Sequence, residues 1–239
     1  MRPTKKLNTR PTCFWQHRVR VFLVLNSGMT LHQNNFIIQA TSLNFSYPDQ
    51  KIFINFSAHV PPGITLVRGG DGRGKTTLLR LLAGELSAHS GQLCIDGADL
   101  QTQPADYKSK IFFTDPRSDA FDQITALNYF EQQRANFANF DHDALMHLTH
   151  GLGLKEHVHK QLFMLSTGTK RKVFLAAAFA SLAPATLLDE PFAALDAASI
   201  AFVVRWLENR AKKTPRAWVV ADYGAPEGLA LSQVINLGD

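Results

Sequence analysis

The segment from residue 69 to residue 76 carries the most specific chemistry in this chain of 239 residues. It reads Gly-Gly-Asp-Gly-Arg-Gly-Lys-Thr and fits the phosphate-binding pattern G-x-x-x-x-G-K-[ST] at every fixed position. Glycines let successive backbone N–H groups curl around phosphate oxygens. Lys75 can then reach the β- and γ-phosphates, and the Thr76 hydroxyl can ligate Mg²⁺. The predicted nucleotide-binding residues of this segment are Gly69, Gly70, Asp71, Gly72, Arg73, Gly74, Lys75, Thr76 and Thr77.

Two flanking elements must hold this loop in place. Residues 64–67 have the composition of a buried strand, and residues 76–83 have that of a helix. The loop would therefore deliver a phosphate group to a helix N-terminus, where free N–H groups and the helix dipole favour anions. This context predicts a site for a nucleoside triphosphate.

Two acids follow a second apolar run, at residues 185–190. The run is typical of a buried parallel strand, and ligands of open α/β sheets collect at the carboxyl ends of such strands. Asp189 is placed there to hold Mg²⁺, directly or through water, and Glu190 is placed to orient or deprotonate an attacking water. Taken alone, the pair could also be an ordinary acidic turn.

A serine and a glycine open a third element. Residues 170–178 are rich in Ala and basic or apolar side chains, which predicts a helix, and Ser166 is a good N-cap for it. Ser166 and Gly168 at a helix start form a second candidate anion site. Without the upstream loop, a simple capped helix would be the simpler interpretation.

The order of these three elements resembles that of the ATP-binding cassette (ABC) ATPases, over roughly residues 41–238. Tyr47 stands where the family places an aromatic residue that stacks on adenine. Residues 78–84 resemble the helix after the loop, residues 90–97 the strand that follows it, and residues 194–196 the loop that contacts the opposing subunit. The middle element, Leu-Ser-x-Gly-x, is absent from other phosphate-loop enzymes.

This resemblance implies an α/β fold: a P-loop NTPase ABC cassette with a RecA-like core, an antiparallel β subdomain and an inserted helical subdomain. It also implies that two cassettes, identical or different, sandwich ATP and Mg²⁺ between them. Ser166 and Gly168 would then contact the partner cassette's nucleotide. The expected partner in transport is a separate membrane-spanning subunit, with the cassette peripheral on the cytoplasmic inner face of the cell membrane.

Several positions depart from the family pattern. Asp115 stands where the family has a Gln that senses Mg²⁺ and water, and we count it as a candidate metal ligand beside Thr76 and Asp189. Asp222 stands where a His contacts the γ-phosphate, and a carboxylate there repels phosphate. Tyr223 could substitute as the hydrogen-bond donor. The helix start also carries Thr167 and Thr169 in place of the usual Gly and Gln.

We therefore expect an ATPase with slow turnover, in which Glu190 and Lys75 are the catalytic residues. The principal hypothesis is the ATP-binding subunit of a membrane transporter, because the compact core resembles export-type cassettes such as those of haem export in cytochrome c maturation. The alternatives are a hydrolysis-impaired cassette that serves as a regulatory or heterodimeric partner, and a soluble ABC ATPase that acts outside transport.

Charge is concentrated at the start of the chain. Residues 1–28 contain six basic side chains and no acid, so of the net charge of +5 the remaining residues carry −1. The cassette itself is therefore near neutral, and its charge gives no reason to expect nucleic-acid binding.

We predict that residues 1–28 are a basic extension, either a disordered arm or a segment that precedes a true start at Met29. The apolar run at residues 21–25 is too short and lies too late in the chain for a signal peptide.

The remaining layout predicts one cassette over residues 29–239. Strands are expected at residues 42–47 and 51–60, and a helical subdomain at about 117–164 with helices at 125–137 and 143–152. A further helix at 196–213 precedes strands at 218–221 and 233–238. No apolar run reaches the roughly eighteen residues that span a bilayer. The two cysteines suggest neither a disulfide framework nor a metal site.

Overall fold

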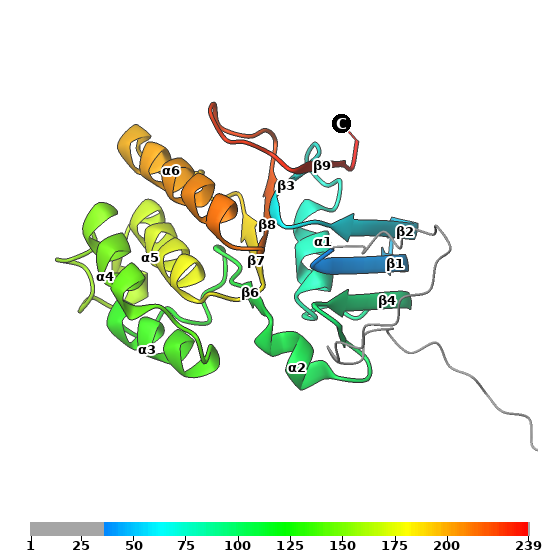
Figure 1. Ribbon diagram of the computed structural model, residues 1–239, viewed down its shortest axis with the longest axis horizontal. Helices are drawn as coiled ribbons and strands as arrows, with labels where there is room; N and C mark the ends of the chain where they lie inside the picture. Colours follow the sequence, from blue (N-terminus) through cyan, green and yellow to red (C-terminus); the bar gives the residue numbers. More distant parts are fainter. Residues whose placement is uncertain (1–35, 239) are drawn as a thin grey trace, which may run out of the picture.

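The computed structural model describes residues 36–238, which form two sheets surrounded by helices (Figure 1). The predicted basic extension, residues 1–28, and the proposed start at Met29 lie outside the described residues. The division into a cassette and an inserted helical subdomain stays a prediction, although the helices expected between residues 117 and 164 are present.

The first sheet is antiparallel, and its strands lie in the order β2-β1-β4-β5. A tight turn joins β1 to β2, with Tyr47 paired to Gln50 at its base. This sheet confirms the two strands predicted before the phosphate-binding segment. The strands are β1 (Ile38–Tyr47), β2 (Gln50–Val60), β4 (Ser90–Ile95) and β5 (Ala98–Asp99).

The second sheet is parallel and positions the predicted site. Its order is β6-β7-β8-β3-β9, and every paired strand runs in the same direction. Arg68 pairs with Asp222, and Asp189 pairs with Ala221, so the carboxyl ends of β3, β7 and β8 meet at one edge. The strands are β3 (Gly63–Arg68), β6 (Ile111–Phe113), β7 (Ala185–Asp189), β8 (Ala217–Asp222) and β9 (Gln233–Asn236).

Helices cover both faces of the parallel sheet. In Figure 1, α1 lies between the two sheets, whereas α3 to α6 lie on the opposite side. Trp218 and Val220 of β8 face the core formed with these four helices, and Ala217, Val219 and Ala221 face the core shared with α1. The helices are α1 (Lys75–Leu82), α2 (Pro104–Ser109), α3 (Ala126–Asn136), α4 (His142–Gly151), α5 (Thr167–Ala180) and α6 (Ala197–Lys213).

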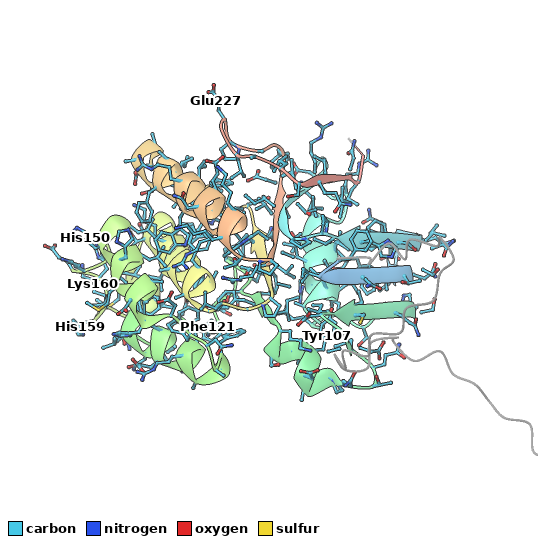
Figure 2. The ribbon with its side chains drawn as sticks, viewed as in Figure 1. Tyr107, Phe121, His150, His159, Lys160 and Glu227 are labelled. Carbon is cyan, nitrogen blue, oxygen red and sulfur yellow. The ribbon has the colours of Figure 1, made fainter. Side chains whose placement is uncertain are left out.

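The short helix α2 was not predicted from the sequence. Its six residues are too few to show a helical period. It is held instead by Tyr107, a fully buried side chain whose hydroxyl donates to the Leu82 carbonyl oxygen at 2.6 Å (Figure 2). Burial raises the pKa of Tyr107 well above its usual range, so the hydroxyl stays a donor.

None of the helices in residues 36–238 combines the length and apolarity needed to cross a bilayer.

Candidate nucleotide-binding site

The phosphate-binding segment forms a loop between β3 and α1, as predicted. Lys75 is buried in it, and its ammonium donates to the carbonyl oxygens of Gly69 at 2.7 Å and Gly70 at 3.0 Å. Gly74, the N-cap of α1, has a φ of 91°, and a Cβ there would lie 2.6 Å from the Ile52 side chain. Only glycine fits this position, because both the backbone angle and the approach of β2 exclude a side chain.

Thr76 and Asp189 meet at the carboxyl edge of the sheet. The Thr76 hydroxyl donates to Asp189 Oδ2 at 2.8 Å, although the two residues are far apart in the sequence. The other oxygen of this carboxylate, Oδ1, is buried and has no hydrogen-bond partner within the described residues. Burial raises the pKa of Asp189. A hydroxyl beside a carboxylate is the hard oxygen donor set that Mg²⁺ prefers, so Thr76 and Asp189 fit the ion.

A third side chain, Arg117, reaches the same two residues. Its Nη2 donates to Thr76 Oγ1 at 2.7 Å and to Asp189 Oδ2 at 2.6 Å. Asp115, the third predicted metal ligand, accepts a hydrogen bond from the Arg117 backbone N–H at 2.9 Å and lies 3.6 Å from Nε. Asp115 is therefore joined to the Thr76–Asp189 pair through Arg117.

Sequence reasoning missed Arg117. The signal for it was its position two residues after Asp115, which follows the carboxyl end of the parallel strand β6, where ligands collect.

Glu190 lies just past the end of β7 in a left-handed conformation, with φ of 46°. Its N–H donates to the Ala221 carbonyl oxygen of β8 at 2.8 Å, which holds the backbone in this unfavourable region. The side chain is half-buried beside Asp189. The carboxylate of Glu190 therefore follows directly after Asp189, the expected metal ligand, and the backbone that carries it is held in one conformation.

Asp222 is the last residue of the neighbouring strand β8, and Tyr223 follows it. The Asp222 carboxylate accepts from the Tyr223 N–H at 2.8 Å, and burial, with the charge of Glu190, raises the pKa of Asp222 against the opposing effect of Lys75. The Lys75 ammonium lies 4.1 Å from the centre of the Tyr223 ring, a cation–π contact. The Tyr223 hydroxyl also donates to Asp71, so this aromatic side chain covers the phosphate-binding loop.

Tyr47 is the predicted adenine-stacking residue and lies at the end of β1. Tyr47 is 39 % exposed, and its hydroxyl hydrogen-bonds to Thr77 Oγ1 of α1 at 3.3 Å. Phe45 packs against it edge-on, with ring centres 5.1 Å apart. An accessible aromatic ring therefore stands beside the phosphate-binding helix.

The second candidate anion site lies elsewhere in the chain. Ser166 caps α5, and its Oγ accepts from the Thr169 N–H at 3.2 Å. The start of α5 packs on residues 193–196: Lys172 forms an ion pair with Asp196 at 2.8 Å, and this bond lowers the pKa of Asp196. Within residues 36–238 neither Ser166 nor Gly168 bonds to the phosphate-binding loop.

Gly168 is fixed by a close backbone contact. A Cβ at this position would lie 2.4 Å from the Ala194 carbonyl oxygen, so Gly168→Ala must displace the 193–196 segment. We expect the variant to lose about 1–3 kcal/mol of unfolding free energy, which lowers Tm by roughly 2–4 °C per kcal/mol. Thermal unfolding measures this. Gly224→Ala, where nothing lies within 4 Å, is the matched control, and an equal Tm for both variants would contradict the close contact.

Comparison with known proteins agrees with this geometry. The family model described as ABC transporter matches residues 54–193. The cytochrome c biogenesis ATP-binding export protein CcmA of Legionella pneumophila is 31 % identical over 183 residues, which cover 74 % of this chain and 88 % of that protein. The CcmA protein of Xanthomonas oryzae pv. oryzae is 30 % identical over 212 residues, covering 82 % and 92 %.

Solved structures share the fold. The ATP-binding subunit of an ABC transporter superposes with a TM-score of 0.69 at 18 % identity, covering 77 % of this chain and 79 % of that one. A nucleotide-free ATP-binding cassette from an ABC transporter gives 0.62 at 19 % identity, covering 78 % and 81 %. Together with the family match, the loop around Lys75 and the Thr76–Asp189 contact, these likenesses establish that the chain belongs to the ABC transporter family as an ATP-binding subunit.

Proposed function

We propose that this chain is the ATP-hydrolysing cassette of a compact exporter, with the active-site roles predicted from its sequence. The observation that carries the proposal is the contact of Thr76 with Asp189 at 2.8 Å beside a lysine enclosed by the phosphate-binding loop. The likeness to CcmA, an ATP-binding export protein, supports export as the direction of transport. Hydrolysis requires bound ATP, an activated water and charge compensation, and each has a candidate residue at this edge of the sheet.

Lys75 and the backbone N–H groups of residues 69–76 hold the phosphates. Thr76 and Asp189 would hold Mg²⁺, which supplies positive charge to the phosphates when bound. Glu190, next to Asp189 and outside the loop, orients the attacking water and accepts its proton. Tyr47 offers its exposed ring to the adenine.

Ser166 and Gly168 serve a second nucleotide. Ser166 bonds within its own helix start, and Gly168 lies against the Ala194 carbonyl group. Because neither residue bonds to the phosphate-binding loop within residues 36–238, we infer that they contact ATP bound to a partner cassette. ABC ATP-binding subunits dimerise, and a head-to-tail pair would bring each capped helix start to the other subunit's phosphates. The partner is an identical chain or a related cassette.

Slow turnover is the second part of the proposal. The half-buried Asp222 stands beside Lys75, where its negative charge opposes a γ-phosphate. Tyr223 contacts both Lys75 and Asp71, and these two contacts must rearrange when a phosphate binds in the loop. These features also favour the second candidate function, a cassette that binds ATP and relies on a partner cassette for most of the hydrolysis.

Asp222→Asn removes this charge while keeping the size of the side chain. We expect its affinity for ATP to rise about 3- to 10-fold, or roughly 1 kcal/mol, because the repulsion of the phosphate is lost. Titration with a fluorescent ATP analogue measures the change. Asp143→Asn, at an exposed position of α4, is the matched control. An unchanged or weaker affinity in Asp222→Asn would show that Asp222 does not face the nucleotide.

The transport role requires a membrane partner. ABC ATP-binding subunits pair with membrane subunits, and we propose that this chain lies on the cytoplasmic face of a membrane against such a subunit. Affinity purification of the tagged chain from detergent-solubilised membranes should return a multi-spanning protein in a fixed ratio to the cassette. Recovery with ribosomes or DNA in its place would overturn the transport role and favour a soluble ABC ATPase.

A further inference from the structure

The guanidinium of Arg117 lies where the two best candidate ligands for a divalent cation meet. Nη2 is 2.7 Å from Thr76 Oγ1 and 2.6 Å from Asp189 Oδ2, and these two oxygens are themselves 2.8 Å apart. One nitrogen thus bridges the hydroxyl and the carboxylate. The positive charge expected between these oxygens is supplied by the chain itself.

The surrounding charges explain why a cation is needed there. The Asp189 side chain is only 1 % exposed, and a buried carboxylate without a counter-ion is costly. Asp115 and Glu190 add negative charge. Burial lowers the pKa of Arg117, but the combined attraction of Asp189, Asp115 and Glu190 outweighs this effect and raises it. Arginine suits this position because it is permanently charged and presents several donors in one plane.

A divalent cation and Arg117 cannot both use these oxygens fully. Mg²⁺ binds oxygen ligands at about 2.0–2.1 Å and takes up their lone pairs. The lone pairs that Thr76 Oγ1 and Asp189 Oδ2 would offer to the ion now accept from Nη2. Binding of the ion to these two oxygens therefore requires the guanidinium to withdraw from them, and the Arg117 side chain, 56 % exposed, has a path into solvent.

We propose that Arg117 is a built-in counter-ion that competes with the divalent cation for Thr76 and Asp189 and makes nucleotide binding by this chain only weakly dependent on Mg²⁺. Within the described residues Nη1 makes no hydrogen bond, so it is available to a phosphate oxygen while Nη2 stays on Asp189. This inference rests on the proposed function, because it concerns the same nucleotide site.

The competition predicts a specific linkage. Without metal, Arg117 supports ATP binding by supplying positive charge; with metal, it opposes binding by occupying the ligands. Both effects reduce the ratio of the ATP dissociation constant in EDTA to that in Mg²⁺. Removing the guanidinium should therefore raise this ratio, by weakening metal-free binding, by strengthening metal-dependent binding, or by both.

The test is calorimetric titration of the full chain with ATP, once in EDTA and once in excess Mg²⁺. For the natural chain we expect the two dissociation constants to differ by less than about 10-fold, whereas in Arg117→Ala the ratio should be at least about 10-fold larger, the scale of one lost charge-assisted hydrogen bond. Arg117→Lys keeps the charge but has no planar fork, and its ratio should lie between the two. Arg134→Ala is the matched control, because Arg134 is 59 % exposed and lies on α3, where it pairs with Glu131.

The outcomes separate this inference from the proposed function. If the natural chain, Arg117→Ala and Arg134→Ala bind ATP with the same ratio, Arg117 is not a counter-ion for the site and the inference is overturned. If the folded natural chain binds no ATP in either condition, the proposed function fails together with the inference. Thermal unfolding of each variant confirms that the compared proteins are folded.

Discussion

Glu190→Gln is expected to reduce ATP turnover by at least about 100-fold while leaving ATP binding intact. A positioned general base contributes roughly 10²–10⁴-fold to such a reaction, and the amide of Gln keeps the size of the side chain but cannot accept the proton. The backbone at residue 190 has a φ of 46° and is held by the bond to Ala221, so the substituted side chain should keep its direction.

Two measurements check this expectation: phosphate release by the purified chain, and ATP affinity of the same preparations. Glu227→Gln is the matched control, since Glu227 lies at the tip of the loop between β8 and β9, far from the phosphate-binding loop (Figure 2). Equal turnover in the natural chain and Glu190→Gln would remove the general-base role. If both released negligible phosphate, the chain would be the hydrolysis-impaired cassette of the second candidate function.

Lys75→Ala is expected to weaken ATP binding by at least about 100-fold. Lys75 is 7 % exposed, and its ammonium donates to the carbonyl oxygens of Gly69 and Gly70, so it already points into the loop. Hydrogen bonds to charged groups contribute about 1.5–3 kcal/mol each, and Lys75 offers more than one to a triphosphate. The variant also loses the cation–π contact with Tyr223, which we expect to loosen the loop.

Titration with a fluorescent ATP analogue measures this loss, and thermal unfolding shows that the variant is folded. Lys108→Ala, at an exposed position of α2, is the control for the removal of one positive charge. Binding by Lys75→Ala within a few-fold of the natural chain would show that the loop does not hold phosphate through this side chain.

The parts of the site that depend on residues at fixed positions within a short segment could be predicted from the sequence. The phosphate-binding loop requires glycines and a lysine at fixed positions, so residues 69–76 determine both the local backbone and its chemistry. The N-cap at Ser166 is likewise local, because a hydroxyl three residues before a backbone N–H is the capping geometry. Asp189 and Glu190 were found because a short apolar run predicts a buried strand whose end lies at the ligand edge.

The missed contacts join exposed long side chains to residues far away in the sequence. Arg117 reaches Asp189 across 72 positions, and Tyr223 reaches Asp71 across 152. Such contacts depend on the order of β6, β7, β8 and β3 in the sheet, and no local pattern encodes that order. The sequence showed Asp115 and Asp222 as departures from the family pattern and offered Tyr223 as a hydrogen-bond donor. Only the fold shows that Arg117 bonds to Asp189 and that Tyr223 contacts Lys75 and Asp71.

The central claim is that residues 69–76 hold a triphosphate, and calorimetric titration of the intact chain with ATP and with adenosine tests it most directly. The account predicts saturable binding of one ATP per chain and no measurable binding of adenosine, because the loop contributes backbone N–H groups and Lys75 to phosphate oxygens. Absence of ATP binding, or equal affinity for adenosine, would contradict it.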